Sequence, residues 1–257
     1  MRNQLNVDWS TLPIPIDDGT LKHLQGKKLP EIKLNATDGA EIDLSLLKGL
    51  TVVYAYPRTG RPDEPVLDGW DVIPGARGCT PQSCAFRDHF TELTHAGVDR
   101  IFGLSTQDTA YQQEAVKRLE LPFSLLSDDR LIFSGTLQLP TFHIKGLTLL
   151  KRFTMIIRDG TVLKIFYPVF PPDQNAAEVV NWLHINLSWK KARHVNNVPG
   201  LFACSTPAAT TRMLLNSPAS SCGFRRQDRL RYGHSRTADR PCKQRIDHRT
   251  AWRRQER

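Results

Sequence analysis

Short apolar runs alternate with helical patterns between about residues 30 and 187, and this alternation constrains the fold more than any other feature of the chain. The run TVVYAY at 51–56 is rich in β-branched and aromatic residues, which is typical of a buried central strand. Other strands are predicted at 100–105, 123–126, 153–157 and 161–167, and helices at 80–97, 108–119 and 175–187. Strands that alternate with helices predict an α/β fold with a central mixed sheet.

Residue pairs that favour tight turns predict two hairpins among these elements. Residues 30–44, PEIKLNATDGAEIDL, predict two short strands around an Asp38-Gly39 turn. An Asp159-Gly160 turn is predicted to join the strands at 153–157 and 161–167.

The charge of the chain changes sign near Lys190. Residues 190–257 hold 16 Lys and Arg against 4 Asp and Glu, a net charge of +12, although the whole chain carries only +9. The part before Lys190 is therefore mildly acidic. We expect three regions: an N-terminal extension at 1–24, a folded domain at 25–189 and a basic tail at 190–257.

The tail is poor in aliphatic residues and rich in arginine, so disorder is the default expectation. Three interpretations remain open: a genetic accident such as a frameshift past a normal stop, solvated disorder without a role, and a basic arm that binds nucleic acid through phosphates. A Cys/His set in the tail has the elements of a zinc site but matches no known spacing; it consists of Cys222, His234, Cys242 and His248.

No apolar run reaches the roughly 18 residues that a membrane span needs. The first residues also lack a basic stretch followed by an apolar core, so no secretory signal is expected. We therefore predict a cytoplasmic protein that does not bind membranes, and in that compartment stable structural disulfides are rare.

The most informative local pattern is Cys79 at the start of the predicted helix 80–97, where Thr80 is expected as the cap and Gly97 as the end. Free backbone N–H groups and the helix dipole at such a position favour a thiolate, which is the form of cysteine that attacks peroxides. Cys84 follows five residues later. The alternatives are an inert thiol at position 79, a small buried hydrophobic residue at position 84, and a zinc site with His89 and His95.

The spacing of the two cysteines limits what they can do together. In an ideal helix, residues five apart have Cα atoms about 8–9 Å apart, whereas a disulfide needs less than about 7 Å. Cys79 and Cys84 can therefore bond only if the first turns of the helix unwind.

The segment GCTPQSCAFRD resembles the active-site segment of the peroxiredoxins, and more narrowly that of their bacterioferritin-comigratory, or Q-type, branch. The matching residues are Gly78, Cys79, Thr80, Cys84, Phe86, Arg87 and Asp88. VVYAYP resembles the strand and proline that precede the family's active-site loop, which puts that proline at Pro57. KRFTMIIRDG resembles the segment with the family's active-site arginine, which falls on Arg152. The resemblance covers about residues 25–187.

This resemblance implies a thioredoxin-like peroxiredoxin fold and the reduction of hydrogen peroxide or organic hydroperoxides. Cys79 is then the attacking cysteine, Cys84 the resolving one, and Arg152 the cation beside the thiolate. Thioredoxin or a similar dithiol is expected as the reductant, with no metal or organic cofactor. A second hypothesis is a redox-sensing protein whose basic tail docks on nucleic acid.

One departure from the family concerns the active-site hydroxyl. The family's motif places a threonine three residues before the cysteine, where this chain has Ala76. An insertion of roughly 60–74 separates Pro57 from Cys79. We expect either Thr59, folded back toward the sulfur, or Thr80 to take over that hydroxyl's role.

Overall fold

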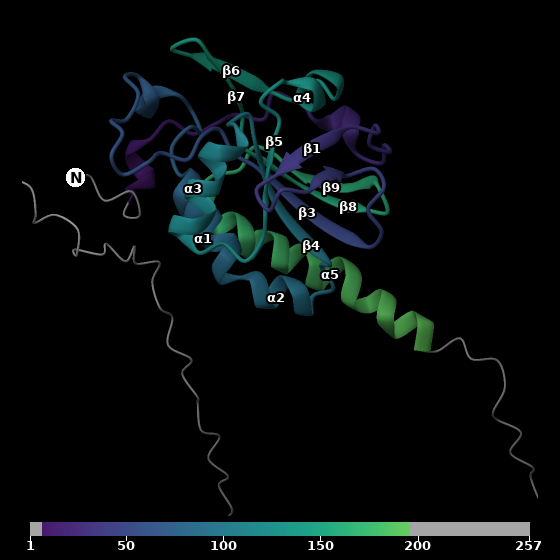
Figure 1. Cartoon of the computed structure of the whole chain (residues 1–257). Coiled ribbons are helices and arrows are strands. Elements are labelled where there is room, and N and C mark those ends of the chain that lie inside the picture. Colours follow the sequence, from purple (N-terminus) through teal and green to yellow (C-terminus); the bar gives the residue numbers. More distant parts are fainter. Residues whose placement is uncertain (1–6, 196–257) are drawn as a thin grey trace, which may run out of the picture.

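Strand β3 (Leu50–Ala55) lies inside a seven-stranded mixed sheet in the computed structural model, which describes residues 7–195 (Figure 1). The strand order is β2-β1-β5-β4-β3-β8-β9. The remaining strands of this sheet are β1 (Lys33–Ala36), β2 (Glu41–Asp43), β4 (Arg100–Ser105), β5 (Leu125–Ser127), β8 (Phe153–Arg158) and β9 (Thr161–Phe166). Every residue of β3 is buried, as its sequence predicts. The predicted α/β fold with a central mixed sheet is confirmed.

The directions of the strands identify the edge of the sheet at which a functional site is expected. β3 pairs in parallel with β4 and antiparallel with β8, and β4 pairs in parallel with β5. The carboxyl ends of β3 and β4 therefore meet at the same edge, which is where ligands bind in open α/β sheets. Both predicted hairpins are present, because β1 pairs with β2 and β8 with β9 in antiparallel register.

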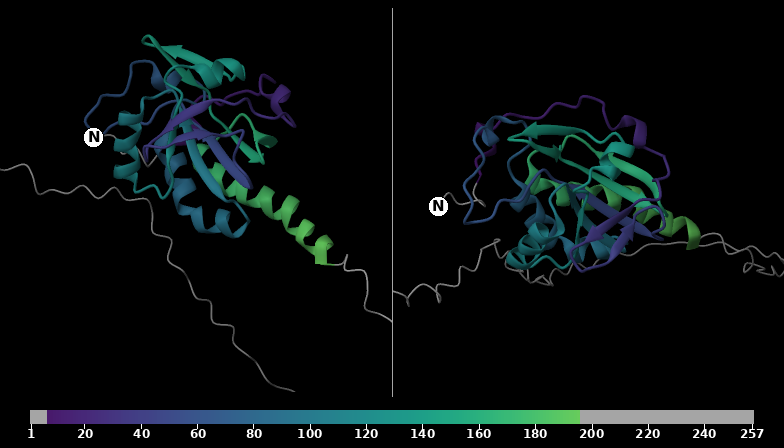
Figure 2. Two further views of the ribbon diagram at one scale, coloured as in Figure 1. Left: turned by 45° about the vertical axis from the view of Figure 1, so that its right-hand side comes forward. Right: turned by 45° about the horizontal axis from the view of Figure 1, so that its top comes forward.

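The helices divide between the two faces of the sheet. The main helices are α1 (Cys79–Asp88), α2 (Phe90–His95), α3 (Thr109–Leu119), α4 (Ile132–Thr136) and α5 (Asn175–Val195). Side chains alternate between faces along a strand. Tyr54 accordingly packs with residues of α1, α2, α3 and α5, whereas Val53 packs with α4 and with Leu21 and Leu24 of the N-terminal segment. Figures 1 and 2 show α5 beside α1 and α2 on one face.

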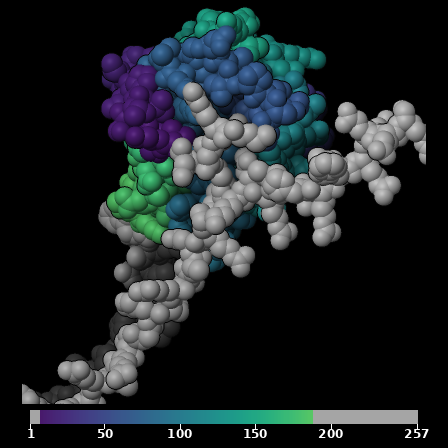
Figure 3. All heavy atoms as spheres, turned by 90° about the vertical axis from the view of Figure 1, so that its left-hand side faces the viewer, coloured from purple at the N-terminus to yellow at the C-terminus, as the bar shows by residue number. Residues whose placement is uncertain are grey.

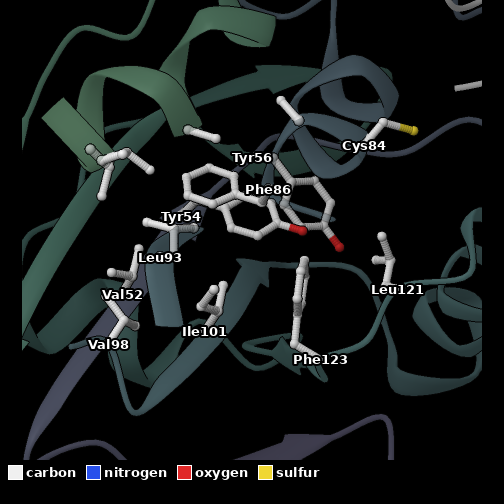
Figure 4. Close-up of a cluster of buried hydrophobic side chains, with 14 of the residues drawn as sticks. Val52, Tyr54, Tyr56, Cys84, Phe86, Leu93, Val98, Ile101, Leu121 and Phe123 are labelled. Carbon is white, nitrogen blue, oxygen red and sulfur yellow. The ribbon is translucent and has the colours of Figure 1, made fainter. Parts of the chain in front are cut away.

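The buried hydrophobic residues on the Tyr54 face of the sheet form a core that includes side chains of α1. Tyr54 stacks on Phe86 of α1 with ring centroids 4.4 Å apart, and Phe123 meets Tyr54 edge-on at 6.0 Å (Figure 4). Phe86 is fully buried. This aromatic contact holds α1 against β3 and so ties the cysteine-bearing helix to the centre of the sheet.

The prediction of one continuous helix over 80–97 is wrong. His89 has φ −92° and ψ 9°, outside the helical range, and separates α1 from α2. The cap is also different, because the helix begins at Cys79 and is preceded by Gly78 in a left-handed conformation rather than capped by Thr80. The expected end is confirmed: Gly97 has φ +95°, and Val98 N–H donates to the Leu93 carbonyl at 3.1 Å.

Two further elements were not predicted. β6 (Thr141–Ile144) and β7 (Leu147–Leu150) form a separate hairpin, and α4 follows β5. The hairpin turns at Lys145 and Gly146, which both have positive φ, as a tight two-residue turn requires. Lysine is uncommon at a turn position with positive φ, so the sequence did not indicate this turn. In Figure 1 the hairpin projects from the body of the molecule.

Several predictions concern residues outside the described range. Residues 1–6 and 196–257 are not described, so the predicted disorder of the tail, its zinc set and its nucleic-acid binding stay predictions. Within residues 7–195, no helix is long and apolar enough to cross a membrane. The same part of the chain contains no cluster of three or more His, Cys, Asp or Glu arranged to hold a metal ion.

Candidate active site

Cys79 is placed by a glycine that no other residue can replace without strain. Gly78 has φ +103°, and a Cβ atom at this position would lie 2.7 Å from both Pro172 and the Trp9 ring. The left-handed backbone and this close approach both require glycine. Gly78 therefore turns the chain directly into α1, so that Cys79 is the first residue of that helix.

The Cys79 sulfur faces two N–H donors and one carbonyl. Arg152 Nη2 lies 3.3 Å from Sγ, and the backbone N–H of Arg58 lies 3.4 Å from it. Sγ in turn lies 3.6 Å from the Ala76 carbonyl oxygen, which accepts from the protonated thiol. Cys79 is a free thiol and is 4% exposed. Two donors aimed at the sulfur can stabilise negative charge that develops near it.

Arg152 is a buried cation whose neighbours are neutral. The residue is 3% exposed, and its guanidinium donates to Gln82 Oε1 and to the carbonyl oxygens of Ala76 and Arg77. No carboxylate lies within ion-pair distance of Arg152 in the described part of the chain. A buried charge without a counter-charge is costly. The group placed to compensate it is the sulfur of Cys79 once that sulfur becomes a thiolate.

A polar network that the sequence did not predict holds Arg152 in this position. Gln82 Nε2 donates to Asn175 Oδ1 at 3.0 Å, and Thr154 Oγ1 donates to the same oxygen at 2.6 Å. All three residues are fully buried. The network joins α1, the start of α5 and strand β8. Its only sequence signal is Gln82, an amide on the buried side of α1 between the two cysteines.

The two buried phenols near the sulfur, those of Tyr54 and Tyr56, are neutral. Burial raises the pKa of Tyr54 and of Tyr56, so both phenols stay protonated at physiological pH. The Tyr54 hydroxyl donates to Ser83 Oγ at 3.1 Å. Arg152 is therefore the dominant charge that acts on Cys79 from within the core.

The structure places the two candidate hydroxyl groups, those of Thr59 and Thr80, in different surroundings. Thr59 is fully buried, and its Oγ1 donates to Gln107 Oε1 at 3.2 Å rather than to the sulfur. Gln107 also accepts the Thr59 N–H and donates to the Thr59 carbonyl, which fixes the loop after β3. Thr80 lies next to Cys79 in the wall of a pocket, and its hydroxyl bonds to no described residue.

Cys84 lies within the same intact helix as Cys79 and is 3% exposed. Figure 4 shows its sulfur pointing away from the rings of Tyr54 and Phe86. Since Cys79 is free, the two cysteines are not bonded to each other here. The helix is regular from Cys79 to Asp88, so the expected need for unwinding stands as a prediction.

A pocket opens above Cys79, with a volume of about 80 Å³. Its lining comes from three places: the loop after β3, the insertion at 60–74, and the start of α1. The residues are Arg58, Gly60, Glu64, Pro65, Val66, Leu67, Trp70, Arg77, Gly78, Cys79, Thr80 and Pro81. A nucleophile, a fixed cation and an accessible pocket thus meet at the carboxyl ends of β3 and β4.

Comparison with known proteins decides the family. The family model described as redoxin matches residues 24–181, which is more than half of the chain. The chain belongs to the redoxin family. The putative peroxiredoxin bcp of Coxiella burnetii is 30% identical over 162 residues, which cover 62% of this chain and 97% of that protein. The resemblance to the Q-type, or bcp, peroxiredoxins is thereby confirmed.

One further relative and one solved structure agree with this family assignment. The chloroplastic peroxiredoxin Q of Oryza sativa subsp. japonica is 32% identical over 161 residues, or 62% of this chain and 66% of that protein, just under two thirds of its length. The crystal structure of peroxidoxin BcpB from Mycobacterium tuberculosis matches with a TM-score of 0.52 at 24% identity, covering 64% of this chain and 98% of that one. That likeness confirms the predicted thioredoxin-like peroxiredoxin fold. Because the rice relative is named chloroplastic, a cytoplasmic location stays a prediction for this redoxin.

Replacing Arg152 by alanine should slow the reaction of Cys79 with iodoacetamide at neutral pH by about tenfold, because the permanent cation beside the thiolate is lost. Arg152→Lys should also be impaired, because a point charge cannot keep the hydrogen bonds of the planar group. Alkylation rates of the parent and the variants at neutral pH test this. A rate equal to that of the parent would contradict the electrostatic role of Arg152.

Proposed function

We propose that this redoxin is a thiol-dependent peroxidase in which the Cys79 thiolate attacks a peroxide. The observation that carries the proposal is the buried guanidinium of Arg152, which has no carboxylate within ion-pair distance among the described residues and lies 3.3 Å from the Sγ of Cys79, a residue that lines a pocket. The thiolate attacks one peroxide oxygen and the O–O bond breaks. Cys79 becomes a sulfenic acid, and the other oxygen leaves and takes up a proton as an alcohol or water.

The donors around the sulfur suit this step. Negative charge moves from sulfur toward the leaving oxygen as the O–O bond breaks, and preorganised donors stabilise such developing charge without reorganising. Arg152 Nη2 and the Arg58 N–H are already directed at the reacting atom. Their positions depend on the buried Gln82 network and on the Thr59–Gln107 contacts, respectively.

Cys84 serves as the resolving residue of the reduced protein in this proposal. Its thiol condenses with the Cys79 sulfenic acid, which forms a disulfide and releases water. Since both residues lie in α1, the first turns must unwind. Thioredoxin or a similar dithiol then reduces the disulfide and restores both thiols.

In this proposal, Thr80 supplies the active-site hydroxyl that donates a hydrogen bond to the bound peroxide. The family's threonine is replaced by Ala76, which has no hydroxyl, and the Thr59 hydroxyl is engaged by Gln107. The Thr80 hydroxyl lines the pocket beside Cys79 and is not bonded to any described residue. It can therefore donate to a bound peroxide without breaking an existing contact.

Cys79→Ser should abolish peroxide consumption, because a serine hydroxyl is not a comparable nucleophile at neutral pH. The test is thioredoxin-dependent peroxide turnover by the purified, pre-reduced full-length chain. Substantial turnover by the Cys79→Ser protein would refute the proposed function.

Cys84→Ser should still consume about one equivalent of peroxide but should not recycle through an intramolecular disulfide. The sulfenic acid at Cys79 should then accumulate, and dimedone should label it, as mass spectrometry can show. Cys79→Ser is the matched control, since it should give no label. An unchanged thioredoxin-dependent rate in Cys84→Ser would exclude Cys84 as the resolving residue.

Thr80→Val should slow the oxidation of Cys79 in a single turnover by about tenfold, because valine keeps the shape of threonine and removes the hydroxyl. Thr59→Val is the matched variant at the other candidate position. A larger loss of rate in Thr59→Val than in Thr80→Val would instead assign the hydroxyl to Thr59. Far-ultraviolet circular dichroism should show that both variants fold.

A further inference from the structure

The N-terminal residues cross the surface beside the start of α1. Residues 8–18, which we call the N-terminal strap, lie outside the range 24–181 that the redoxin model matches. The strap begins with a short helix, Trp9–Thr11, which Asp8 caps by accepting the Ser10 N–H at 3.1 Å. Figure 3 shows the purple N-terminal residues at the surface, against the blue and the green parts of the chain. The match to the family therefore does not account for this part of the structure.

Trp9 covers the start of α1. Its ring fills the space beside Gly78, where a Cβ atom would lie 2.7 Å from the ring. The Gly78 carbonyl accepts a hydrogen bond of the first helical turn, from the Gln82 N–H at 3.0 Å. This turn must open before Cys79 can bond to Cys84. Because Trp9 packs directly on Gly78, the turn cannot unwind in this direction unless Trp9 moves away.

Trp9 is held by the segment that leads into α5. Its Nε1–H donates to Asp173 Oδ2 at 3.0 Å, and its ring meets that of Phe170 edge-on with centroids 6.1 Å apart. The other carboxylate oxygen of Asp173, Oδ1, is buried and has no hydrogen-bond partner among the described residues. Loss of the indole donor would leave this carboxylate poorly satisfied, which costs free energy. Trp9 thus joins the start of α1 to the start of α5.

Two further contacts fix the rest of the strap. Pro15 lies against Gly75, since a Cβ atom at that position would lie 3.4 Å from Pro15 Cγ. Asp18 Oδ2 accepts from Lys151 Nζ at 2.9 Å, and Lys151 directly precedes Arg152 in the chain. The strap is therefore attached to the body of the protein along its length, and these attachments keep its aromatic end at the helix start.

We propose that Trp9 is a positioning residue that keeps the first turn of α1 wound, and that Trp9 must leave Gly78 and Asp173 before the disulfide forms. The inference rests on the proposed peroxidase function and goes beyond it, because it assigns control of one step to the strap. In that step the Cys84 sulfur attacks the sulfur of the Cys79 sulfenic acid. The S–S bond forms, the S–O bond breaks, and the hydroxyl leaves with the thiol proton as water.

The first arm of the test measures amide hydrogen exchange by mass spectrometry in the reduced full-length chain, without peroxide. Trp9→Ala should speed exchange in peptides that cover residues 79–84 by about fivefold or more, because a packing contact and a hydrogen bond are lost. Peptides from β3 and β4 should not change. Trp9→Phe should give a smaller increase, since the ring stays and only the N–H donor is removed.

Ile16→Ala is the matched control for this arm. Ile16 belongs to the strap and is 84% exposed, so its removal should leave exchange at 79–84 unchanged. Asp173→Ala removes the acceptor of the indole N–H without altering the strap, and it should act in the same direction as Trp9→Phe. These two variants keep the test decisive if circular dichroism shows that Trp9→Ala does not fold.

The second arm follows a single turnover with hydrogen peroxide in the same proteins, quenched at intervals and read by mass spectrometry. In Trp9→Ala the rate constant of disulfide formation should rise by about fivefold or more, whereas that of peroxide attack should not rise, because only the disulfide step requires the turn to open. A residue that served only the general stability of the fold would not accelerate one step of the reaction.

The outcomes separate this inference from the proposed function. Exchange at 79–84 that is unchanged in Trp9→Ala, or raised equally in Ile16→Ala, would overturn the inference. A disulfide step that is unchanged or slower in Trp9→Ala would overturn it as well. If peroxide does not oxidise Cys79 in the parent, the proposed function fails, and hydrogen exchange alone decides whether Trp9 holds the start of the helix.

Discussion

The contact between the Arg152 guanidinium and the Cys79 sulfur is the constraint on which the rest of the site depends. A buried cation without a carboxylate is unfavourable, so the surrounding structure must hold it there. The amide of Gln82 and the carbonyls of Ala76 and Arg77 do so by accepting its hydrogen bonds. These acceptors are neutral, which leaves the positive charge available to the sulfur. A carboxylate in their place would neutralise it.

In the proposed mechanism, the same contact links catalysis to the stability of α1. Arg152 is bonded to Gln82, and Gln82 to Asn175 at the start of α5, so the first turn of α1 belongs to a buried network. Formation of a bond between Cys79 and Cys84 requires that turn to open. The network that holds Arg152 beside the sulfur therefore opposes the disulfide step of the proposed mechanism, and loss of the thiolate's charge on oxidation would remove part of that opposition.

Residues 60–74, interpreted from the sequence as an insertion relative to the family's motif, contribute to the wall of the pocket beside Cys79. Ala76 replaces the hydroxyl-bearing residue, yet its carbonyl still contacts both Cys79 and Arg152. The inserted residues are accommodated at the surface, where they pack on α3 and on the β6–β7 hairpin. They form one wall of the pocket beside the buried sulfur and its donors.

The sequence alone determined the strands of the seven-stranded sheet, the helical segments at α1, α3 and α5 and the position of Cys79, because the apolar periodicity of β3 and the GCTPQSC segment are local signals. It missed the break at His89, the β6–β7 hairpin and α4, whose signals are short. The Gln82–Asn175–Thr154 network, the pairing of Thr59 with Gln107 and the pocket wall required the tertiary structure. Each joins residues far apart in the chain, and whether a buried polar group is satisfied depends on which partners folding brings within hydrogen-bond distance.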